Sequence, residues 1–245
     1  MRLRTTLCKH GWTLALAALL GGLCSSAEAQ QRILAAKQVP AAEIACRFVG
    51  RAFTNNAGVG EILGYFTSIN GVGDSDTVFN GPPSEATAFF TFRALFSLQA
   101  LPLNGDVQPY IVSSGTFDIY YNPSPNGDWS DPESFSAGQL VAHFMRPESL
   151  FIRVLQSDPA NPGVFESISV HDVTEILASS QSFTFKGHRY DLGNLVPSGI
   201  TLYETISNTL VPGVTDPDPR LGPLPYGLPL AGHGIPVAST DQDQQ

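Results

Sequence analysis

The sequence predicts an all-β protein, a single antiparallel β-barrel of about eight strands. Short β-prone runs alternate along the chain with clusters of Gly, Pro, Asn and Asp, which are typical of turns. The chain contains 15 Phe but only 2 Met, a composition that suits a rigid β core. Residues 116–121 alternate cleanly between two faces. A two-sheet β-sandwich remains the alternative, because apolar residues on both faces of a strand suit either architecture.

The N-terminal residues 1–29 have the three parts of a secretory signal peptide. Arg2, Arg4 and Lys9 form a basic region, residues 12–23 form a short apolar run, and residues 27–29 (AEA) provide a small-x-small cleavage site. The apolar run is too short for a transmembrane helix. We therefore expect a periplasmic or secreted protein with no membrane contact after cleavage.

Charge and cysteine content limit the partners and the chemistry. The formal net charge is −9, and losing the basic signal makes the mature chain more acidic, which argues against nucleic acid as a partner. Cys8 and Cys24 leave with the signal, so Cys46 has no intramolecular partner. We expect Cys46 to be a small buried hydrophobic residue.

The mature chain divides into a leader, a β domain and a tail. Residues 30–43 are expected to be a flexible leader, residues 44–210 the β domain, and residues 211–245 a Pro- and Gly-rich extended or disordered tail. Within the domain a short helix could form at residues 173–180, where Val173, Ile176 and Leu177 follow helical spacing. Strands are expected at residues 44–53, 61–70, 86–98, 107–121, 138–145, 149–155, 164–172, 182–186, 188–192 and 199–206.

Residues 107–155 form the most distinctive unit, a long β-hairpin with an elaborate polar tip at residues 122–133. Its return arm contains Pro147, which cannot donate to a β-ladder, so we expect two strands there rather than one. The succession of strands with short turns has an architectural resemblance to calycin-type barrels, in strand number only. The chain carries no GxSxG, HExxH, Walker or CxxC motif.

The polar tip offers two candidate functions. Trp129 lies between Asp128 and Ser130, where an exposed aromatic ring would contact a ligand or partner, or would fold back over the barrel. Oxygen-bearing side chains in the same loop could hold calcium, although an ordinary solvated turn has the same composition. These candidate calcium ligands are Asn126, Asp128, Asp131 and Glu133.

A second candidate site depends on which face of residues 116–121 is inside the barrel. If the face of Asp118 and Tyr120 were inside, these residues with Arg93 and His143 would form a polar cavity for a small molecule or for acid–base chemistry. If the face of Phe117 were inside, as alternation with an apolar core favours, the polar residues would be solvated.

The histidines offer a third, weaker possibility. A barrel could bring His143, His171 and His188 together as a metal site with Glu148 or Asp172, but none of the three has another histidine at i+2 or i+4. Separate histidines are the simpler expectation, and we expect no cofactor unless the tip loop binds calcium.

Two functions follow from the sequence. The first is non-enzymatic binding of a small molecule, glycan or protein partner, favoured by the acidic surface, the aromatic tip and the missing catalytic motifs. The second is a barrel enzyme of the cyclase or isomerase type, which needs only a few polar residues in an apolar cavity.

Overall fold

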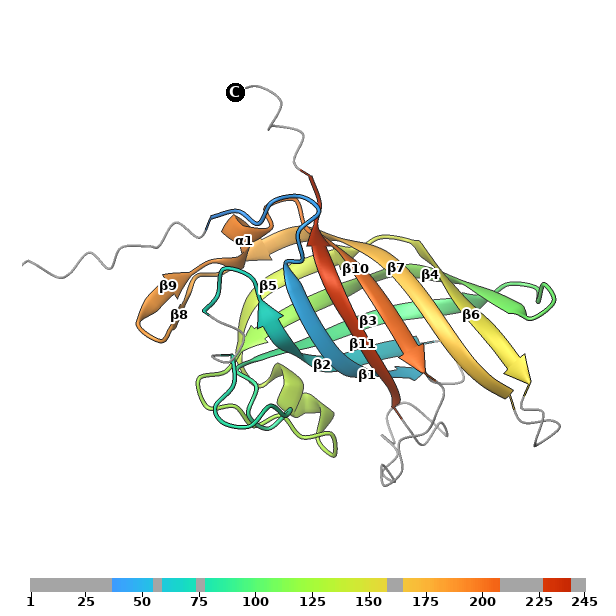
Figure 1. Cartoon of the computed structure of the whole chain (residues 1–245), viewed down its shortest axis with the longest axis horizontal. Helices are drawn as coiled ribbons and strands as arrows, with labels where there is room; N and C mark the ends of the chain where they lie inside the picture. Colours follow the sequence, from blue (N-terminus) through green and yellow to red (C-terminus); the bar gives the residue numbers. More distant parts are fainter. Residues whose placement is uncertain (1–36, 55–58, 74–77, 158–164, 208–226, 239–245) are drawn as a thin grey trace, which may run out of the picture. The chain divides into compact units, whose positions relative to one another are not determined.

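The computed structural model describes residues 37–54, 59–73, 78–157, 165–207 and 227–238. The expected signal peptide and the first part of the expected leader lie outside these residues. The described chain is almost entirely β, with two short helical segments, the 3-10 helix Pro132–Ser136 and α1 (Leu192–Leu195) (Figure 1). Among the described residues no helix has the length and apolarity needed to cross a membrane.

Eleven strands are present in the described residues. Their bounds are β1 (Cys46–Thr54), β2 (Val59–Ile69), β3 (Phe90–Ala100), β4 (Val107–Tyr121), β5 (Gln139–Arg146), β6 (Ser149–Ser157), β7 (Phe165–Ser180), β8 (Phe183–Phe185), β9 (His188–Tyr190), β10 (Ile200–Ser207) and β11 (Leu228–Pro236).

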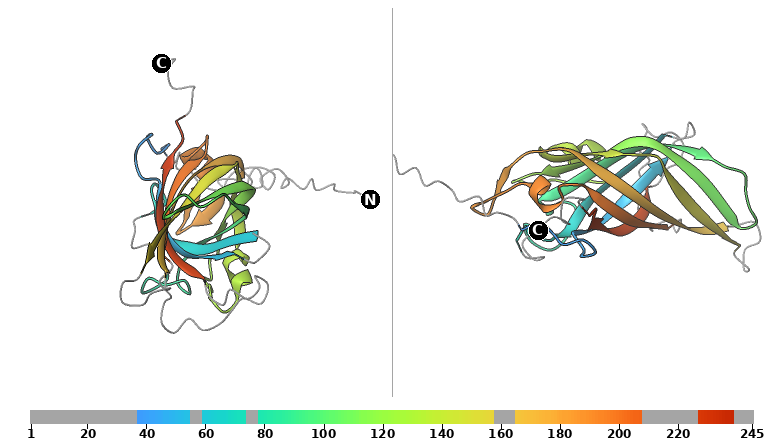
Figure 2. Two further views of the ribbon diagram at one scale, coloured as in Figure 1. Left: turned by 90° about the vertical axis from the view of Figure 1, so that its right-hand side faces the viewer. Right: turned by 90° about the horizontal axis from the view of Figure 1, so that it is seen from above.

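The main sheet closes into an antiparallel barrel. Neighbouring strands follow the order β10-β11-β1-β2-β3-β4-β5-β7, and a further ladder between β7 and β10 completes the ring (Figure 2). Closure confirms the barrel and excludes the sandwich alternative, because a closed ladder leaves no two separate sheets to pack face to face.

The ninth strand, β6, shares one position in the ring with β5. In β4, Gly115–Tyr121 pair with β5 and Val107–Val112 pair with β6. The same division occurs on β7, whose last residues pair with β5 and whose first residues pair with β6. The ladder is interrupted at Pro147 and Glu148, as the missing N–H of proline predicts.

Aromatic side chains fill much of the barrel interior. Phe117 on β4 is fully buried and packs on Phe92 and Phe144, with ring centroids 5.3 and 5.9 Å away. Phe48 and Phe66 extend this packing across β1 and β2. The face of Phe117 is therefore the interior face, and the alternating face of Asp118 and Tyr120 points outward.

One end of the barrel is covered by a small hairpin and a helical turn. Strands β8 and β9 lie at this end of the barrel (Figure 1) and are joined by a turn with Lys186 and Gly187 at positive φ. Phe183 and Phe185 on this hairpin pack against Phe90. At the same end α1 buries Leu192 and Leu195. Cys46 lies nearby, and burial raises the pKa of its thiol to about 12, as expected for an unreactive buried residue.

The structure corrects two expectations about regular structure. Residues 173–180 are not helical but form the last half of β7. Pairing with β10 on one side and with β5 on the other overrides an apolar spacing that is compatible with both a helix and a strand. The expected tail contains a strand, β11, which lies between β1 and β10 and closes the barrel. The rest of residues 211–245, apart from 227–238, lies outside the described chain.

Candidate functional site

Four of the five residues predicted to bind a ligand lie together on the outer wall of the barrel. Arg93 on β3 is the register partner of Asp118 on β4, and Asp118 is the partner of His143 on β5. His143 Nδ1 and Asp118 Oδ1 are 2.5 Å apart, and both side chains are partly exposed. Burial, with the nearby Asp118 charge, raises the pKa of Tyr120. These residues are thus clustered, but outside the barrel rather than in a cavity.

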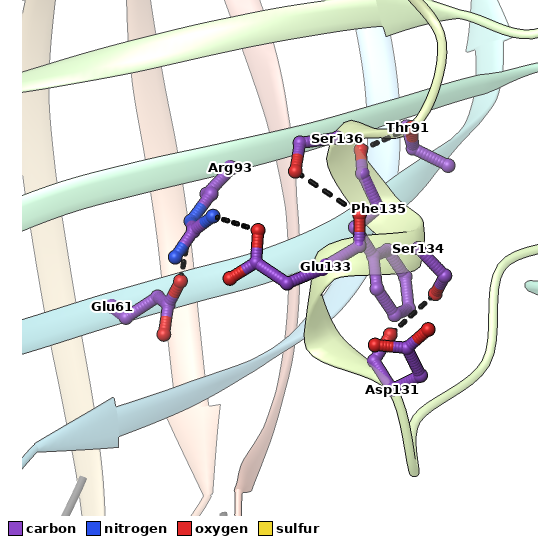
Figure 3. Close-up of polar contacts among 8 residues, drawn as sticks. All are labelled: Glu61, Thr91, Arg93, Asp131, Glu133, Ser134, Phe135 and Ser136. Atoms are coloured by element: carbon purple, nitrogen blue, oxygen red, sulfur yellow. Dashed lines mark hydrogen bonds and ion pairs between the residues drawn. The ribbon is translucent and has the colours of Figure 1, made fainter. Parts of the chain in front are cut away.

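Arg93 connects the wall to the hairpin tip. Its Nε lies 2.5 Å from Glu61 Oε1 on β2, and its Nη1 lies 3.0 Å from Glu133 Oε2 (Figure 3). Thr91 Oγ1 donates a buried hydrogen bond of 2.6 Å to the carbonyl of Phe135. The 3-10 helix of the tip is therefore held against β2 and β3 by charge and by hydrogen bonding.

Trp129 folds back onto this wall instead of projecting outward. Its ring lies 4.5 Å from the ring of Phe135, and the guanidinium carbon of Arg51 lies 4.3 Å from the indole centroid. Much of the aromatic surface that a sugar or partner would use is therefore already packed. Ligand binding by Trp129 and its neighbours stays a prediction.

Three of the four candidate calcium ligands in the tip have separate partners for their side-chain oxygens, namely Asn126, Asp128 and Glu133. Asp128 Oδ1 accepts from Ser130, Asn126 Oδ1 accepts from Asn122, and Glu133 pairs with Arg93. The Ser134 hydroxyl donates to the backbone carbonyl of Asp131 (Figure 3). Across the part of the chain that the structure describes, no three His, Cys, Asp or Glu side chains are grouped as metal ligands would be.

The three histidines of the alternative metal site are separated by the barrel wall. His143 is on the outer wall, His171 points inside, and His188 is exposed on the β8–β9 hairpin. They do not converge, because His143 lies on the outward face of β5, His171 lies on the inward face of β7, and His188 lies on a hairpin that is not part of the ring.

A different group of polar residues, which the sequence analysis did not identify as a site, lies inside the barrel. We call it the interior polar cluster, and it consists of Arg146, Ser149, His171, Glu175 and Glu204. It is built from the four strands β5, β6, β7 and β10. The side chains of Arg146, Glu175 and Glu204 are completely buried.

Arg146 is only partly satisfied by its two carboxylates. Its Nε donates to Glu175 Oε1 at 2.7 Å, whereas Nη2 is 3.7 Å from Glu204 Oε1, too far for a hydrogen bond. Nη1 and Nη2 of Arg146, Glu175 Oε2 and Glu204 Oε1 are buried without hydrogen-bond partners. The ring of Phe96 packs 5.4 Å from the guanidinium carbon. A buried arginine with two nitrogens that lack hydrogen-bond partners is unusual and demands an explanation.

Two further contacts form a hydrogen-bonded relay, Ser149–His171–Glu204. His171 Nδ1 is 2.9 Å from Glu204 Oε2, and Nε2 is 3.0 Å from Ser149 Oγ. A carboxylate can only accept, so in the neutral imidazole the proton sits on Nδ1 and Nε2 accepts from the serine hydroxyl. The base and its orienting carboxylate are fully buried, whereas Ser149 is only partly buried.

The two carboxyl groups of the cluster have pKa values displaced in opposite directions. Burial raises the pKa of Glu175, and this outweighs the opposing effect of the Arg146 charge. Burial also acts to raise the pKa of Glu204, but the hydrogen bond from His171 and the Arg146 charge outweigh it and lower the pKa. Such divergence between neighbouring carboxyls is typical of acid–base pairs.

The sequence does contain a signal for this cluster. Glu204 alternates in phase with Ile200, Leu202 and Ile206, so it shares the apolar face of its strand. His171 and Glu175 likewise share a face with the buried Val173. A charged residue on the face that must enter the core marks either a functional site or a paired charge.

A surface groove lies beside the cluster, over the interruption between β5 and β6. It has a volume of about 440 Å³ and is lined by Pro147, Glu148, Ser149, Leu150, Ile152, Val170, Asp172 and Thr174. Ser149 belongs both to this groove and to the relay. At the covered end of the barrel, a second and apolar pocket of about 30 Å³ has room for little more than a water molecule.

Comparison with known proteins adds no family to this description: no family model matches the chain, and neither a curated protein nor a solved structure does so.

Proposed function

We propose that this protein binds an uncharged, largely apolar small molecule through a carbonyl oxygen inside the barrel, at the interior polar cluster. The observation that carries the proposal is Arg146, whose Nη1 and Nη2 are fully buried without hydrogen-bond partners. Leaving a buried donor unsatisfied costs roughly 1–3 kcal/mol, and more for a charged group. A ligand acceptor placed at these nitrogens would remove that cost.

The charges of the cluster favour a neutral ligand. Arg146 is already flanked by Glu175 and Glu204, and the lowered pKa of Glu204 keeps that carboxylate negative. A second anion would face a buried carboxylate at close range, where repulsion is strong. A carbonyl oxygen satisfies the guanidinium without adding charge.

The surroundings of the cluster favour an apolar ligand body. Phe96 packs on Arg146, and Phe151 lies 5.7 Å from the His171 ring. Val173 and Leu202 alternate with the cluster residues and are buried on the same faces. A few oriented polar groups within apolar walls are characteristic of small-molecule sites.

Matched ligand pairs test this proposal. Calorimetry would compare ketones of increasing size, beginning with 4-phenyl-2-butanone, with the corresponding hydrocarbons that lack the oxygen. A hydrogen bond to a charged group contributes roughly 1.5–3 kcal/mol, so the ketone should bind about 10- to 150-fold more tightly. The preference should fall in Arg146→Lys, which keeps the charge but loses the guanidinium. The proposal is contradicted if no ketone in the series binds more tightly than its matched hydrocarbon.

A second candidate function is an acid–base enzyme of the cyclase or isomerase type. The opposite displacement of the Glu175 and Glu204 pKa values supports it, since a carboxyl with a raised pKa and a carboxylate-supported histidine would both contact one bound carbonyl compound. The test is exchange of the ketone's α-hydrogens in D₂O, followed by NMR. Exchange that depends on His171 supports an enzyme, whereas tight binding without exchange supports a carrier.

We also propose that the protein acts after export, in the periplasm or outside the cell, on the strength of residues 1–29. Sequencing the N-terminus of the exported protein tests this, and we expect it to begin at Gln30. Binding of a glycan or protein at the outer wall has a separate test: Arg93→Ala, which leaves the interior polar cluster unchanged, should abolish that binding.

A further inference from the structure

The relay has the connectivity of a nucleophile, a base and an orienting acid. In serine hydrolases a serine hydroxyl donates to a histidine whose other ring nitrogen is held by a carboxylate. Here the two distances are 3.0 Å for Ser149 to His171 and 2.9 Å for His171 to Glu204, both within hydrogen-bonding range. The lowered pKa of Glu204 keeps this carboxyl ionised, as the orienting group must be.

Ser149 lies at the interruption of the barrel wall, where the ladder between neighbouring strands is broken. The β5–β7 ladder ends at Met145 and Ile176, and the β6–β7 ladder begins at Phe151 and His171. Between these ladders Pro147 and Glu148 border the surface groove, and Ser149 follows them directly. The serine therefore stands where the outer groove meets the interior relay.

The groove itself is suited to an apolar chain. Leu150 and Val170 remain 50% and 47% exposed on its walls, although both are large apolar side chains. Ile152 is the register partner of Val170 and continues the same surface along β6. An acyl chain lying there would bury apolar area that is now in contact with water.

We propose that Ser149, His171 and Glu204 form a catalytic triad that hydrolyses esters of apolar acyl chains. This rests on the proposed function, since the ester carbonyl must reach the interior polar cluster. Ser149 Oγ attacks the acyl carbon while its proton passes to His171 Nε2. The bond to the alcohol oxygen breaks, and the alcohol leaves with that proton.

Water completes the reaction. It attacks the acyl carbon and gives a proton to His171, and Ser149 leaves as the restored hydroxyl, so one ester and one water yield one acid and one alcohol. Arg146 is joined to the relay through Glu204 and has two guanidinium nitrogens without hydrogen-bond partners. Donation from these nitrogens would stabilise the negative charge that develops on the ester carbonyl oxygen.

The test is covalent labelling of the full mature protein with an alkyl fluorophosphonate. The Ser149 oxygen displaces fluoride, so one equivalent of hydrogen fluoride is lost and the peptide containing Ser149 gains the phosphonyl mass. Labelling should vanish in Ser149→Ala. In Glu204→Gln the amide would donate to Nδ1 and impose the wrong histidine tautomer, so we expect a decrease on the order of 10³–10⁴-fold.

Controls separate catalysis from folding and from binding. Ser169→Ala removes a buried serine on the neighbouring strand β7 that has no role in the relay, and this variant should label at the wild-type rate. Circular dichroism and melting temperature establish that each variant is folded. Hydrolysis of p-nitrophenyl decanoate should follow the same order of variants.

The outcomes are distinguishable. Folded wild-type protein that gives no adduct at Ser149, or a Glu204→Gln variant that labels normally, overturns the triad. If the protein in that case still binds ketones more tightly than the matched hydrocarbons, the proposal of carbonyl binding at Arg146 stands without the hydrolytic one. If Ser149 is labelled but no ketone preference is found, carbonyl binding at Arg146 fails instead.

Discussion

Replacing Arg146 by Met should destabilise the barrel strongly, although methionine is apolar and nearly as long. Arg146, Glu175 and Glu204 are completely buried, and Glu175 loses a 2.7 Å hydrogen bond in the variant. Removing one partner of a buried ion pair costs about 3–5 kcal/mol because the remaining charge is uncompensated. For a domain of this size each kcal/mol lowers the melting temperature by roughly 2–4 °C, so we expect a decrease of about 6–20 °C.

The matched variant replaces the three charges together, as Arg146→Met, Glu175→Leu and Glu204→Leu. Apolar replacement of a whole buried ion group is often neutral or stabilising by roughly 1–4 kcal/mol. Glu204→Leu also removes the acceptor of His171 Nδ1, at a cost of roughly 1–3 kcal/mol. Calorimetric melting at pH 7 should therefore give the triple variant a melting temperature near that of the wild type and well above that of Arg146→Met. A single variant within 2 °C of wild type, or a triple variant less stable than the single one, would refute the assignment of the cost to unpaired buried charge.

Three further predictions concern pH, core packing and the tip. Burial raises the pKa of Glu175, so the wild type should lose stability as pH rises from the ordinary value of 4.5 through the raised pKa. Urea denaturation should detect this loss in the wild type but not in Glu175→Gln. Glu204 has a lowered pKa, so its stabilisation is present above 4.5 and is lost as pH falls through the lowered value. Phe117→Ala should cost about 3–5 kcal/mol in the same assay, because the ring is fully buried between Phe92 and Phe144. Trp129→Ala, at a half-buried position, should lower the free energy of unfolding by about 2 kcal/mol. If the fluorescence of Trp129 in the folded wild type has the emission wavelength of the unfolded chain, the packing of Trp129 on Phe135 is contradicted.

Local patterns predicted the barrel well where one face of a strand decides its burial. The alternation around Phe117 and the proline in the return arm give the inner face and the β5–β6 interruption directly. β11 was missed because glycine and proline weaken strand propensity. Its glycines serve tertiary packing: a Cβ at Gly232 would lie 2.5 Å from the Phe48 ring, and one at Gly234 would lie 2.8 Å from Cys46 Sγ. That requirement exists only once β11 is beside β1.

The candidate site could be predicted only in part, for a related reason. Alternation identifies Glu204 as a charge on an apolar face, but not the residue that it meets. The meeting of Arg146 with Glu175 depends on the register of β5 against β7, which shifts between His143 and Phe144. Gly115, the register partner of Arg146, also admits a close backbone approach, since a Cβ there would lie 2.0 Å from the Leu95 carbonyl oxygen. Such registers follow from the whole ring rather than from any one strand.

The interior polar cluster is difficult to explain as a stabilising device. Buried charges in other proteins can fix a strand register or an association state. In this barrel the closed ladder already fixes strand order and register, and the aromatic interior around Phe117 forms without charges. The cluster nevertheless leaves Arg146 nitrogens and carboxylate oxygens without hydrogen bonds. It also lies where Pro147 interrupts the wall and where Ser149 borders the groove. An energetically costly group placed beside an interruption of the wall is better explained by a ligand that completes its hydrogen bonds than by the fold that encloses it.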